Sequence, residues 1–248
     1  MFKKIYILWL RQLKRYWRSK PRMIGSLGQP ILFLVALGYG FGSVFQQAGQ
    51  GNYLNFLAPG IIGMAIIFTA IFSGIEIIWD RQFGFLKEVM VAPMSRLEIM
   101  VGRTAGGATV AMLQGLIVLI ISLFVGFHPG WLGMVFILPV MFLVALLFTA
   151  LGIAIASPLN DMQGFQLIMN FLVMPLFFLS GALFPLQDAP PVLATIAAFD
   201  PLSYGVDAFR ALLIGSSHYG LGMDIGILSL VTALFIAAGS YLFSKIQI

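Results

Sequence analysis

The residues of this chain that could do chemistry are few. The sequence has no cysteine, which excludes thiolate nucleophiles, disulfides and cysteine-ligated zinc or iron–sulfur centres. Its two histidines, His128 and His218, are far apart and have no carboxylate at the spacing of a metal site. No glycine-rich phosphate loop of the form GxxxxGKS/T occurs, so we do not expect this chain to hydrolyse ATP alone. The sequence nominates no catalytic, cofactor-binding or metal-binding residue.

The ionisable groups nearest the apolar runs lie at predicted helix ends or in a connection. They are Glu76, Asp80, Glu98, Arg103, Asp207, Arg210 and Asp224. A charge at the bilayer centre costs about 2.5–3.5 kcal/mol on insertion scales. The lack of such charges argues against a proton relay or an ion channel and suits an amphipathic or lipid-like cargo. For Glu76, the deepest of these groups, a salt bridge with Arg81 or Arg103 is the preferred interpretation.

The elements that must position these groups are membrane-spanning helices. Of the 248 residues, 60% are hydrophobic and 9% are charged, and the mean hydropathy is +1.00. A helical crossing needs roughly 20 apolar residues, and continuous runs of that length argue against the shorter alternating strands of a membrane barrel. We expect an all-α integral membrane protein with a single transmembrane domain, residues 1–248. Its six predicted spans are 23–45, 54–79, 100–126, 131–156, 164–184 and 223–244.

Residues 1–22 are expected to form an amphipathic helix that lies in the membrane interface. This segment holds eight of the fourteen Lys and Arg residues of the chain and no acidic residue. Apolar side chains such as Leu8 and Tyr16 recur at helical spacing on one face, and cations such as Arg11 take the other face. A cleaved signal peptide is the weaker alternative, because the apolar run that follows is too long.

Basic residues concentrate on alternate connections. Thirteen of the fourteen lie in the N-terminal segment, between residues 80 and 103 or at the C-terminal end, and only Arg210 lies on the opposite side. The positive-inside rule then places both termini in the cytoplasm, in a multi-pass protein of the cell (cytoplasmic) membrane. The net charge of +5 is accounted for by this topology, so no nucleic-acid partner is expected.

The predicted cytoplasmic connection holds a short amphipathic helix within residues 81–96. Its apolar side chains include Phe83, Phe85 and Leu86, and Pro93 limits its length. An apolar face of this kind fits either the docking of a partner protein or an ordinary loop helix that rests on the membrane. The residues alone favour neither alternative.

Residues 185–215 are too apolar for a solvated loop, yet four prolines divide them into pieces too short to cross the bilayer. Asp200 followed by Pro201 predicts a helix start, and Gly215 predicts a helix stop. Two short helices dipping into the outer leaflet satisfy both the composition and the backbone hydrogen bonds. We therefore expect an external re-entrant helical hairpin here.

Polar residues recur in the fifth span at spacings of three and four. Gln163, Gln166 and Asn170 therefore share one helix face. They fit a transport pathway or a dimer interface, and they fit equally well hydrogen bonds between helices of one chain, worth about 0.6 kcal/mol each. Both interpretations stay open.

Three features, taken in order, resemble the permease subunits of type-2 ABC exporters, which include drug, lipid, polysaccharide and lipo-oligosaccharide export systems. They are the basic interfacial helix, the string from Arg81 to Arg96 with Gly84-Phe85-Leu86 and Ala92-Pro93-Met94-Ser95, and the string FP…PP…DPLSYGVDAFR from Phe184 to Arg210. The resemblance covers nearly the whole chain and is greatest to the drug-resistance and nodulation-factor export branch. It implies the type V exporter fold.

The resemblance also implies partners. Two such permeases, identical or related, would rest on separate ABC ATPase subunits that hold ATP and Mg. The coupling helix that contacts the ATPase would lie within 81–96 and include Arg81, Phe83, Gly84, Phe85, Leu86, Lys87, Glu88 and Pro93. Asn160 and Asp161 would supply a second, smaller contact. The re-entrant hairpin would include Pro185, Pro191, Asp200, Pro201, Tyr204, Asp207 and Arg210.

The sequence therefore predicts a transport subunit, not an enzyme, of an ATP-driven exporter. The exporter would move an amphipathic drug-like, lipid or lipid-linked substrate out of the cytoplasm or the inner leaflet. No cofactor is expected in this chain, and membrane lipid surrounds it. The alternatives are a gradient-driven secondary transporter or channel, which calls for a functional charge at mid-membrane, and a non-transporting membrane scaffold.

Overall fold

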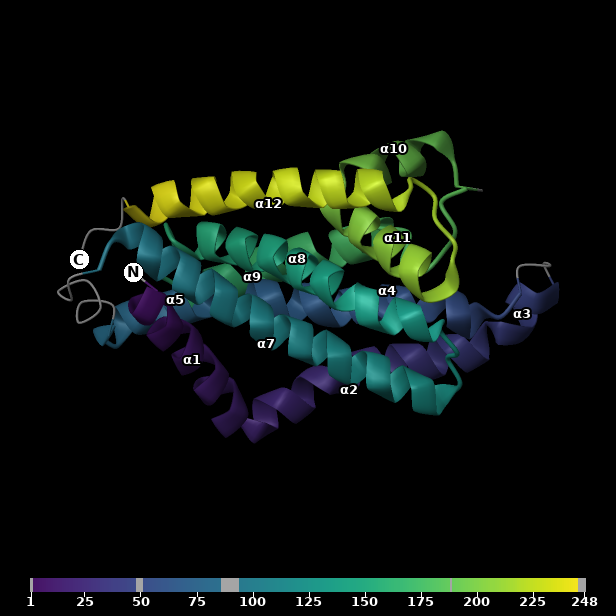
Figure 1. Cartoon of the computed structure of the whole chain (residues 1–248), viewed down its shortest axis with the longest axis horizontal. Helices are drawn as coiled ribbons and strands as arrows, with labels where there is room; N and C mark the ends of the chain where they lie inside the picture. Colours follow the sequence, from purple (N-terminus) through teal and green to yellow (C-terminus); the bar gives the residue numbers. More distant parts are fainter. Residues whose placement is uncertain (1, 48–50, 86–93, 188, 245–248) are drawn as a thin grey trace.

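The chain is a bundle of α-helices. The computed structural model describes residues 2–47, 51–85, 94–187 and 189–244, and these residues contain helices and no strand. Figure 1 shows long helices lying side by side along one axis, with most of the short helices near one end. The prediction of an all-α protein is confirmed.

Eleven helices are described, and their bounds place the spans. They are α1 (Phe2–Arg18), α2 (Lys20–Gly40), α3 (Gly42–Gln47), α4 (Tyr53–Phe72), α5 (Ile75–Gln82), α7 (Arg96–Val125), α8 (Trp131–Ala156), α9 (Met162–Leu179), α10 (Pro191–Phe199), α11 (Pro201–Ile214) and α12 (Leu221–Ser244). In the described part of the chain, six helical segments are long and apolar enough to cross a membrane. These are Met23–Gly40, Tyr53–Gln82, Arg96–Val125, Trp131–Ala156, Met162–Leu179 and Leu221–Phe243. The predicted number of spans is confirmed.

Local chemistry moves two of the predicted boundaries. The second span is interrupted at Ser73 and Gly74, and its last part, α5, continues to Gln82. Arg81 therefore belongs to the end of this span and not to the connection that follows it. The third span begins at Arg96, because Ser95 and Glu98 form a reciprocal capping box: the Ser95 backbone N–H donates to Glu98 Oε2 at 2.8 Å.

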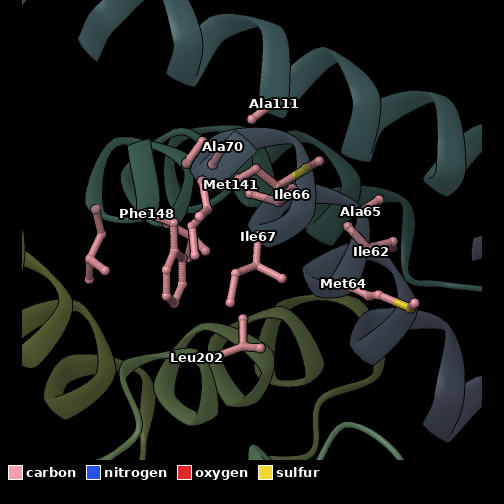
Figure 2. Close-up of a cluster of buried hydrophobic side chains, with 14 of the residues drawn as sticks. Ile62, Met64, Ala65, Ile66, Ile67, Ala70, Ala111, Met141, Phe148 and Leu202 are labelled. Atoms are coloured by element: carbon pink, nitrogen blue, oxygen red, sulfur yellow. The ribbon is translucent and has the colours of Figure 1, made fainter. Parts of the chain in front are cut away.

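Helix α4 forms the centre of the bundle. In the most apolar stretch of the Tyr53–Gln82 span 72% of the residues are buried, against 17% in the first and last spans. Figure 2 shows Ile62, Ile66 and Ile67 of α4 among Met141 and Phe148 of α8, with Ala111 of α7 and Leu202 of α11 beside them. The core is thus one continuous apolar cluster around α4, to which the other helices contribute one face each.

Backbone contact between α4 and α8 depends on a glycine. A Cβ atom built on Gly152 would lie 2.8 Å from Ile71 Cα and closer still to the Ile71 carbonyl oxygen. Small residues let membrane helices approach this closely, and van der Waals contact then replaces the missing hydrophobic drive between spans. A residue with a Cβ atom does not fit at this crossing.

Helix α1 packs one face against α7 and leaves other side chains, such as Trp17, exposed. Leu8, Gln12 and Tyr16 are buried at successive helical turns, and a Cβ on Gly106 of α7 would lie 2.7 Å from Gln12 Cγ. The Trp9 indole N–H donates to Thr109 Oγ1 at 2.9 Å. Figure 1 shows α1 beside the first half of α7, at an angle to α2, which follows it. The predicted amphipathic pattern is thus used partly to bind another helix.

Candidate functional site

Most of the predicted site residues that the structure describes lie at the two ends of the bundle. One end, called here the basic end, holds α1, the end of α5, the start of α7 and residues 157–161. The other, called here the hairpin end, holds α3, α10, α11 and the start of α12. The start of α1 and the end of α12 both lie at the basic end in Figure 1.

A buried ionic cluster ties three helices together at the basic end. Arg11 of α1 binds both carboxylate oxygens of Asp80, at 3.0 and 3.1 Å, and Arg103 of α7 donates to Asp80 Oδ2 at 2.6 Å. Arg15 lies 3.8 Å from Asp80 and 3.6 Å from Glu76. These five residues are called here the Asp80 junction. Bidentate arginine–carboxylate pairs are geometrically specific, so the junction fixes α1 relative to α5.

The partners within the Asp80 junction differ from those expected for Glu76. The sequence nominated Arg81 or Arg103, whereas the structure places Arg15 of α1 against Glu76 and directs the Arg103 guanidinium to Asp80. The amphipathic pattern of α1 did not indicate which helix would receive its cations. Arg11 and Arg15 are therefore functional candidates that sequence reasoning missed.

Arg81 joins α5 to the turn between α8 and α9. Its guanidinium donates to the carbonyl oxygens of Leu159 at 3.0 Å and Ser157 at 2.6 Å, and it also contacts the Asn160 side chain. The Gln82 amide donates to the Asn160 carbonyl at 2.9 Å. Two residues that the family resemblance nominated as separate partner contacts, Arg81 and Asn160, thus lie side by side.

The surface next to this contact is apolar and exposed. The Phe83 side chain is 78% exposed, and Gly84 turns the chain with a φ of +78°, which a residue with a Cβ rarely adopts. The Arg11 guanidinium lies 3.8 Å from the centre of the Phe85 ring. The other nominated coupling residues, Leu86, Lys87, Glu88 and Pro93, lie outside the described residues.

Asp161 has a clear local role. Its carboxylate accepts hydrogen bonds from the backbone N–H groups of Gln163, at 3.2 Å, and Gly164, at 2.6 Å, and so caps the start of α9. The side chain remains exposed. Asp161 can therefore start the helix and still meet a partner at the basic end.

The polar face of α9 points away from the bundle. Gln163, Gln166 and Asn170 are exposed, next to Leu167 and to Phe171, which is 84% exposed. Within the described residues, the three polar side chains make no hydrogen bond to another helix of this chain. Their shared face, predicted from the spacing, is thus available to lipid or to another protein.

Two short helices lie at the hairpin end, and α11 begins and stops where the sequence predicts. Pro191 and Pro201 occupy the first helical positions of α10 and α11. Asp200 accepts a hydrogen bond from the Leu202 backbone N–H at 2.8 Å, and Gly215 ends α11 with a φ of +71°. The Tyr204 hydroxyl donates to the Ala198 carbonyl at 2.7 Å and thereby joins the two helices.

Asp207 and Arg210 share a face of α11 but bind different segments. Asp207 accepts hydrogen bonds from Ser217 Oγ at 2.9 Å and from the backbone N–H groups of His218 and Tyr219, both at 2.8 Å. It thus holds the loop that leads to α12. His218, to which the sequence assigned no ligand role, contributes its backbone to this loop.

Arg210 binds carbonyl groups of α4 and of the segment that follows α9. Its guanidinium donates to the carbonyl oxygens of Phe56 at 3.3 Å, Gly181 at 2.8 Å and Ala182 at 3.2 Å, and it lies 3.8 Å from the centre of the Phe56 ring. Burial lowers the pKa of Arg210 to about 10, so the group stays charged at neutral pH.

The buried cap of α11 predicts a pH dependence of stability. Burial raises the pKa of the Asp200 carboxyl from 3.8 to about 7. Its contribution to stability is therefore fully present below about pH 3.8 and is lost as the pH rises through about 7. Asn caps helices as well as Asp and does not titrate, so we expect Asp200→Asn to lose less thermal stability between about pH 5 and about pH 8 than the unchanged protein. Melting temperatures across that range test this, and parallel curves for the two proteins would contradict it.

Comparisons with known proteins agree with this architecture. Residues 3–214 match the family model described as ABC-2 type transporter. The chain is 29% identical over 230 residues to Nodulation protein J of Rhizobium leguminosarum bv. trifolii, covering 92% of this chain and 85% of that protein. It is 28% identical over 260 residues to the putative transport permease ycf38 of Cyanophora paradoxa (98% and 88% covered) and 31% identical over 224 residues to that of Pyropia yezoensis (86% and 74%).

Proposed function

This chain belongs to the ABC-2 type transporter family and is a multi-pass membrane transport permease; from this premise we propose that it is the membrane-spanning subunit of an ATP-driven exporter. ATP and Mg are held by a separate ABC ATPase subunit. The observation that carries the proposal is at the basic end, where the exposed Phe83 directly follows Arg81 and Gln82, both of which bind Asn160.

The support explains how a partner could drive the bundle. Arg81 fastens the end of α5 to the turn before α9, and the Asp80 junction fastens the same helix to α1 and α7. A force on the end of α5 would therefore reach α1, α7 and the turn between α8 and α9 at once. ATP-dependent closure of the partner subunits would bias the bundle between an inward-closed and an outward-open state, without bond chemistry in this chain.

The proposed orientation places the basic end in the cytoplasm. Eight basic residues of the chain precede residue 23, and the connection after α5 adds more, whereas the hairpin end holds one, Arg210. The positive-inside rule then sets both termini in the cytoplasm of the cell membrane and the hairpin at the outer leaflet. The two short helices α10 and α11 are proposed to dip into that leaflet without crossing it.

A second permease copy completes the proposed assembly. The exposed face of α9 combines three hydrogen-bonding side chains with large apolar ones, among them Phe171. Exposed polar groups are costly in lipid, so contact with a second copy or with a polar pathway satisfies them better than acyl chains do. The cargo proposed is an amphipathic drug-like, lipid or lipid-linked molecule, because the spans supply a largely apolar lining.

Truncation of an exposed aromatic residue tests the docking surface. We expect Phe83→Ala to weaken binding of the co-purifying ATPase subunit at least about tenfold, because buried aromatic anchors dominate interface energies. ATP-dependent transport in proteoliposomes should fall with it, while the melting temperature stays unchanged. The matched control is Phe199→Ala, since Phe199 is 85% exposed at the hairpin end and should leave ATPase binding unaffected.

Two outcomes would count against the proposal. Full ATPase binding and transport by Phe83→Ala would remove Phe83 from the interface. If no ATPase accompanies the protein from native membranes while the purified chain still moves solute along a gradient, the exporter proposal fails and a gradient-driven transporter replaces it. An ATPase complex that turns over ATP but moves no solute would instead favour a scaffold.

A further inference from the structure

A polar pocket lies at the hairpin end, within a single copy of the chain. It has a volume of about 270 Å³ and is bounded by the start of α4, by α11 and by the loop that follows α11. Its polar lining includes Asn52, Asn55, Ser203, Asp207, Arg210 and His218. Ligand pockets usually enclose about 300–1,000 Å³, so this one suits the head of a molecule and not a whole lipid.

Two lining groups are buried without a protein partner. The Ser203 hydroxyl belongs to a side chain that is 1% exposed, and it makes no hydrogen bond to any described residue. Asn55 Oδ1 is likewise buried and unpaired within the same part of the chain. Buried polar groups are nearly always paired, so such atoms in a pocket wall indicate an occupant with hydrogen-bonding groups.

Arg210 supplies the charged donor that remains available in the pocket, which the Asp207 carboxylate also lines. Asp207 already accepts from three donors of the 217–219 loop, whereas no carboxylate of the described residues lies within 4.0 Å of the Arg210 guanidinium. Arg210 Nε and one terminal nitrogen bind carbonyls, and the other terminal nitrogen, Nη1, has no acceptor among the residues described. A partly desolvated guanidinium with a free donor binds phosphate or carboxylate strongly.

An apolar groove continues from this pocket. It has a volume of about 420 Å³, and Phe45 and Pro185 line both spaces. The rest of the groove consists of apolar or aromatic residues: Leu37, Phe41, Val44, Tyr53, Leu183 and Phe184. Phe41 and Val44 are 54% and 61% exposed, so the groove is open along the side of α2 and α3.

We propose that the pocket and the groove together bind one amphipathic molecule with an anionic head. A phosphate or carboxylate would lie at Arg210 and Ser203, and the acyl chain would lie along Phe41 and Val44. This inference rests on the proposed function, because it makes the site a station on the exit side for the exported amphiphile. Polar and apolar halves that share two residues match such a molecule better than two separate ligands.

Binding of two probes to the full chain tests the site. The protein is placed in phosphatidylcholine nanodiscs without ATPase or ATP, and lysophosphatidylglycerol and lysophosphatidylcholine are titrated separately. We expect lysophosphatidylglycerol to bind at least about tenfold more tightly. The choline cation of lysophosphatidylcholine competes with Arg210 for the phosphate, and lysophosphatidylglycerol has no such cation. Equal affinities for the two probes would overturn the assignment of an anionic head.

Variants separate the two halves of the site. Ser203→Val fills the pocket without removing a protein hydrogen bond, and it should weaken binding of the anionic probe at least about tenfold. The control is Thr149→Val, which removes another unpaired buried hydroxyl, in α8, and should leave probe binding unchanged. Val44→Gln should weaken binding about fivefold through the groove. Its control is Val135→Gln, because Val135 is 57% exposed on α8 and lies outside the groove.

Unchanged binding in both Ser203→Val and Val44→Gln would overturn the inference. Arg210→Gln should abolish the preference for the anionic probe, and the other two variants decide the matter if Arg210→Gln does not fold. The assay contains no ATPase, so its failure beside intact ATPase coupling rejects only this site. If no ATPase partner accompanies the protein from native membranes but the purified protein still binds the probe, the exporter proposal fails and the site stands.

Discussion

Asp80→Leu should destabilise the protein by about 3–5 kcal/mol, the cost expected when one partner of a buried ion pair is removed. Arg103 is 2% exposed, and its only acceptor among the described residues is Asp80. The substitution leaves this guanidinium buried without its hydrogen-bonded counter-charge and also releases Arg11 of α1. Both α1 and the end of α5 should then lose their fixed positions.

Thermal unfolding of the detergent-solubilised protein measures this effect. Asp161→Asn is the matched control, because Asp161 is an exposed carboxylate whose capping role Asn can fill, and we expect little change in its melting temperature. Asp80→Leu combined with Arg103→Leu should recover most of the lost stability, since the buried charge is then gone as well. Equal melting temperatures for Asp80→Leu and the control would refute the assignment of Asp80 as the centre of the junction.

Gly152→Val should prevent the bundle from assembling. The new Cβ would lie 2.8 Å from Ile71 Cα, which belongs to the α4 backbone and cannot move aside as the end of a flexible side chain can. Overpacking a core costs about 1–3 kcal/mol when side chains adjust, and we expect at least the top of that range here. The α4–α8 contact lies within the central core, so its separation would expose apolar surface along both helices.

Size-exclusion profiles of the extracted protein distinguish a folded bundle from an aggregated one. Gly226→Val is the control, because Gly226 also lies inside a span, on α12, but a Cβ there meets no atom within 4 Å. We expect the control to elute as a single peak and Gly152→Val to aggregate or be lost from the membrane. A normal peak for Gly152→Val would contradict the close crossing of α4 and α8.

The spans and their caps could be predicted from the sequence because their causes are local. Long apolar runs fix the number of crossings, and Asp200-Pro201 and Gly215 determine where α11 begins and ends. The shared face of Gln163 and Gln166 followed from helical spacing alone, and the structure leaves that face exposed. The interruption at Ser73 was not predicted, although Ser73, Gly74 and the nearby Glu76 break the apolar run at that point.

The Asp80 junction and the polar pocket could not be predicted, because their parts come from distant segments. Arg11 and Asp80 are 69 positions apart, and the pattern of α1 indicates a buried face without indicating what covers it. The pocket joins Asn55 to Ser203 across most of the chain, and isolated polar residues at helix ends give no spacing by which to find them. Only the packing of α11 on α4 brings them together.

The separation between Arg11 and Asp80 also sets an order of events during synthesis. Ribosomes add about 5–20 residues per second, so the 69 positions correspond to roughly 3–14 s in which α1 exists without its acidic partner. During that interval its cations are available to water and to the anionic headgroups that attract basic segments. The ionic contacts that fix α1 against α5 can therefore form only after two further spans have been synthesised.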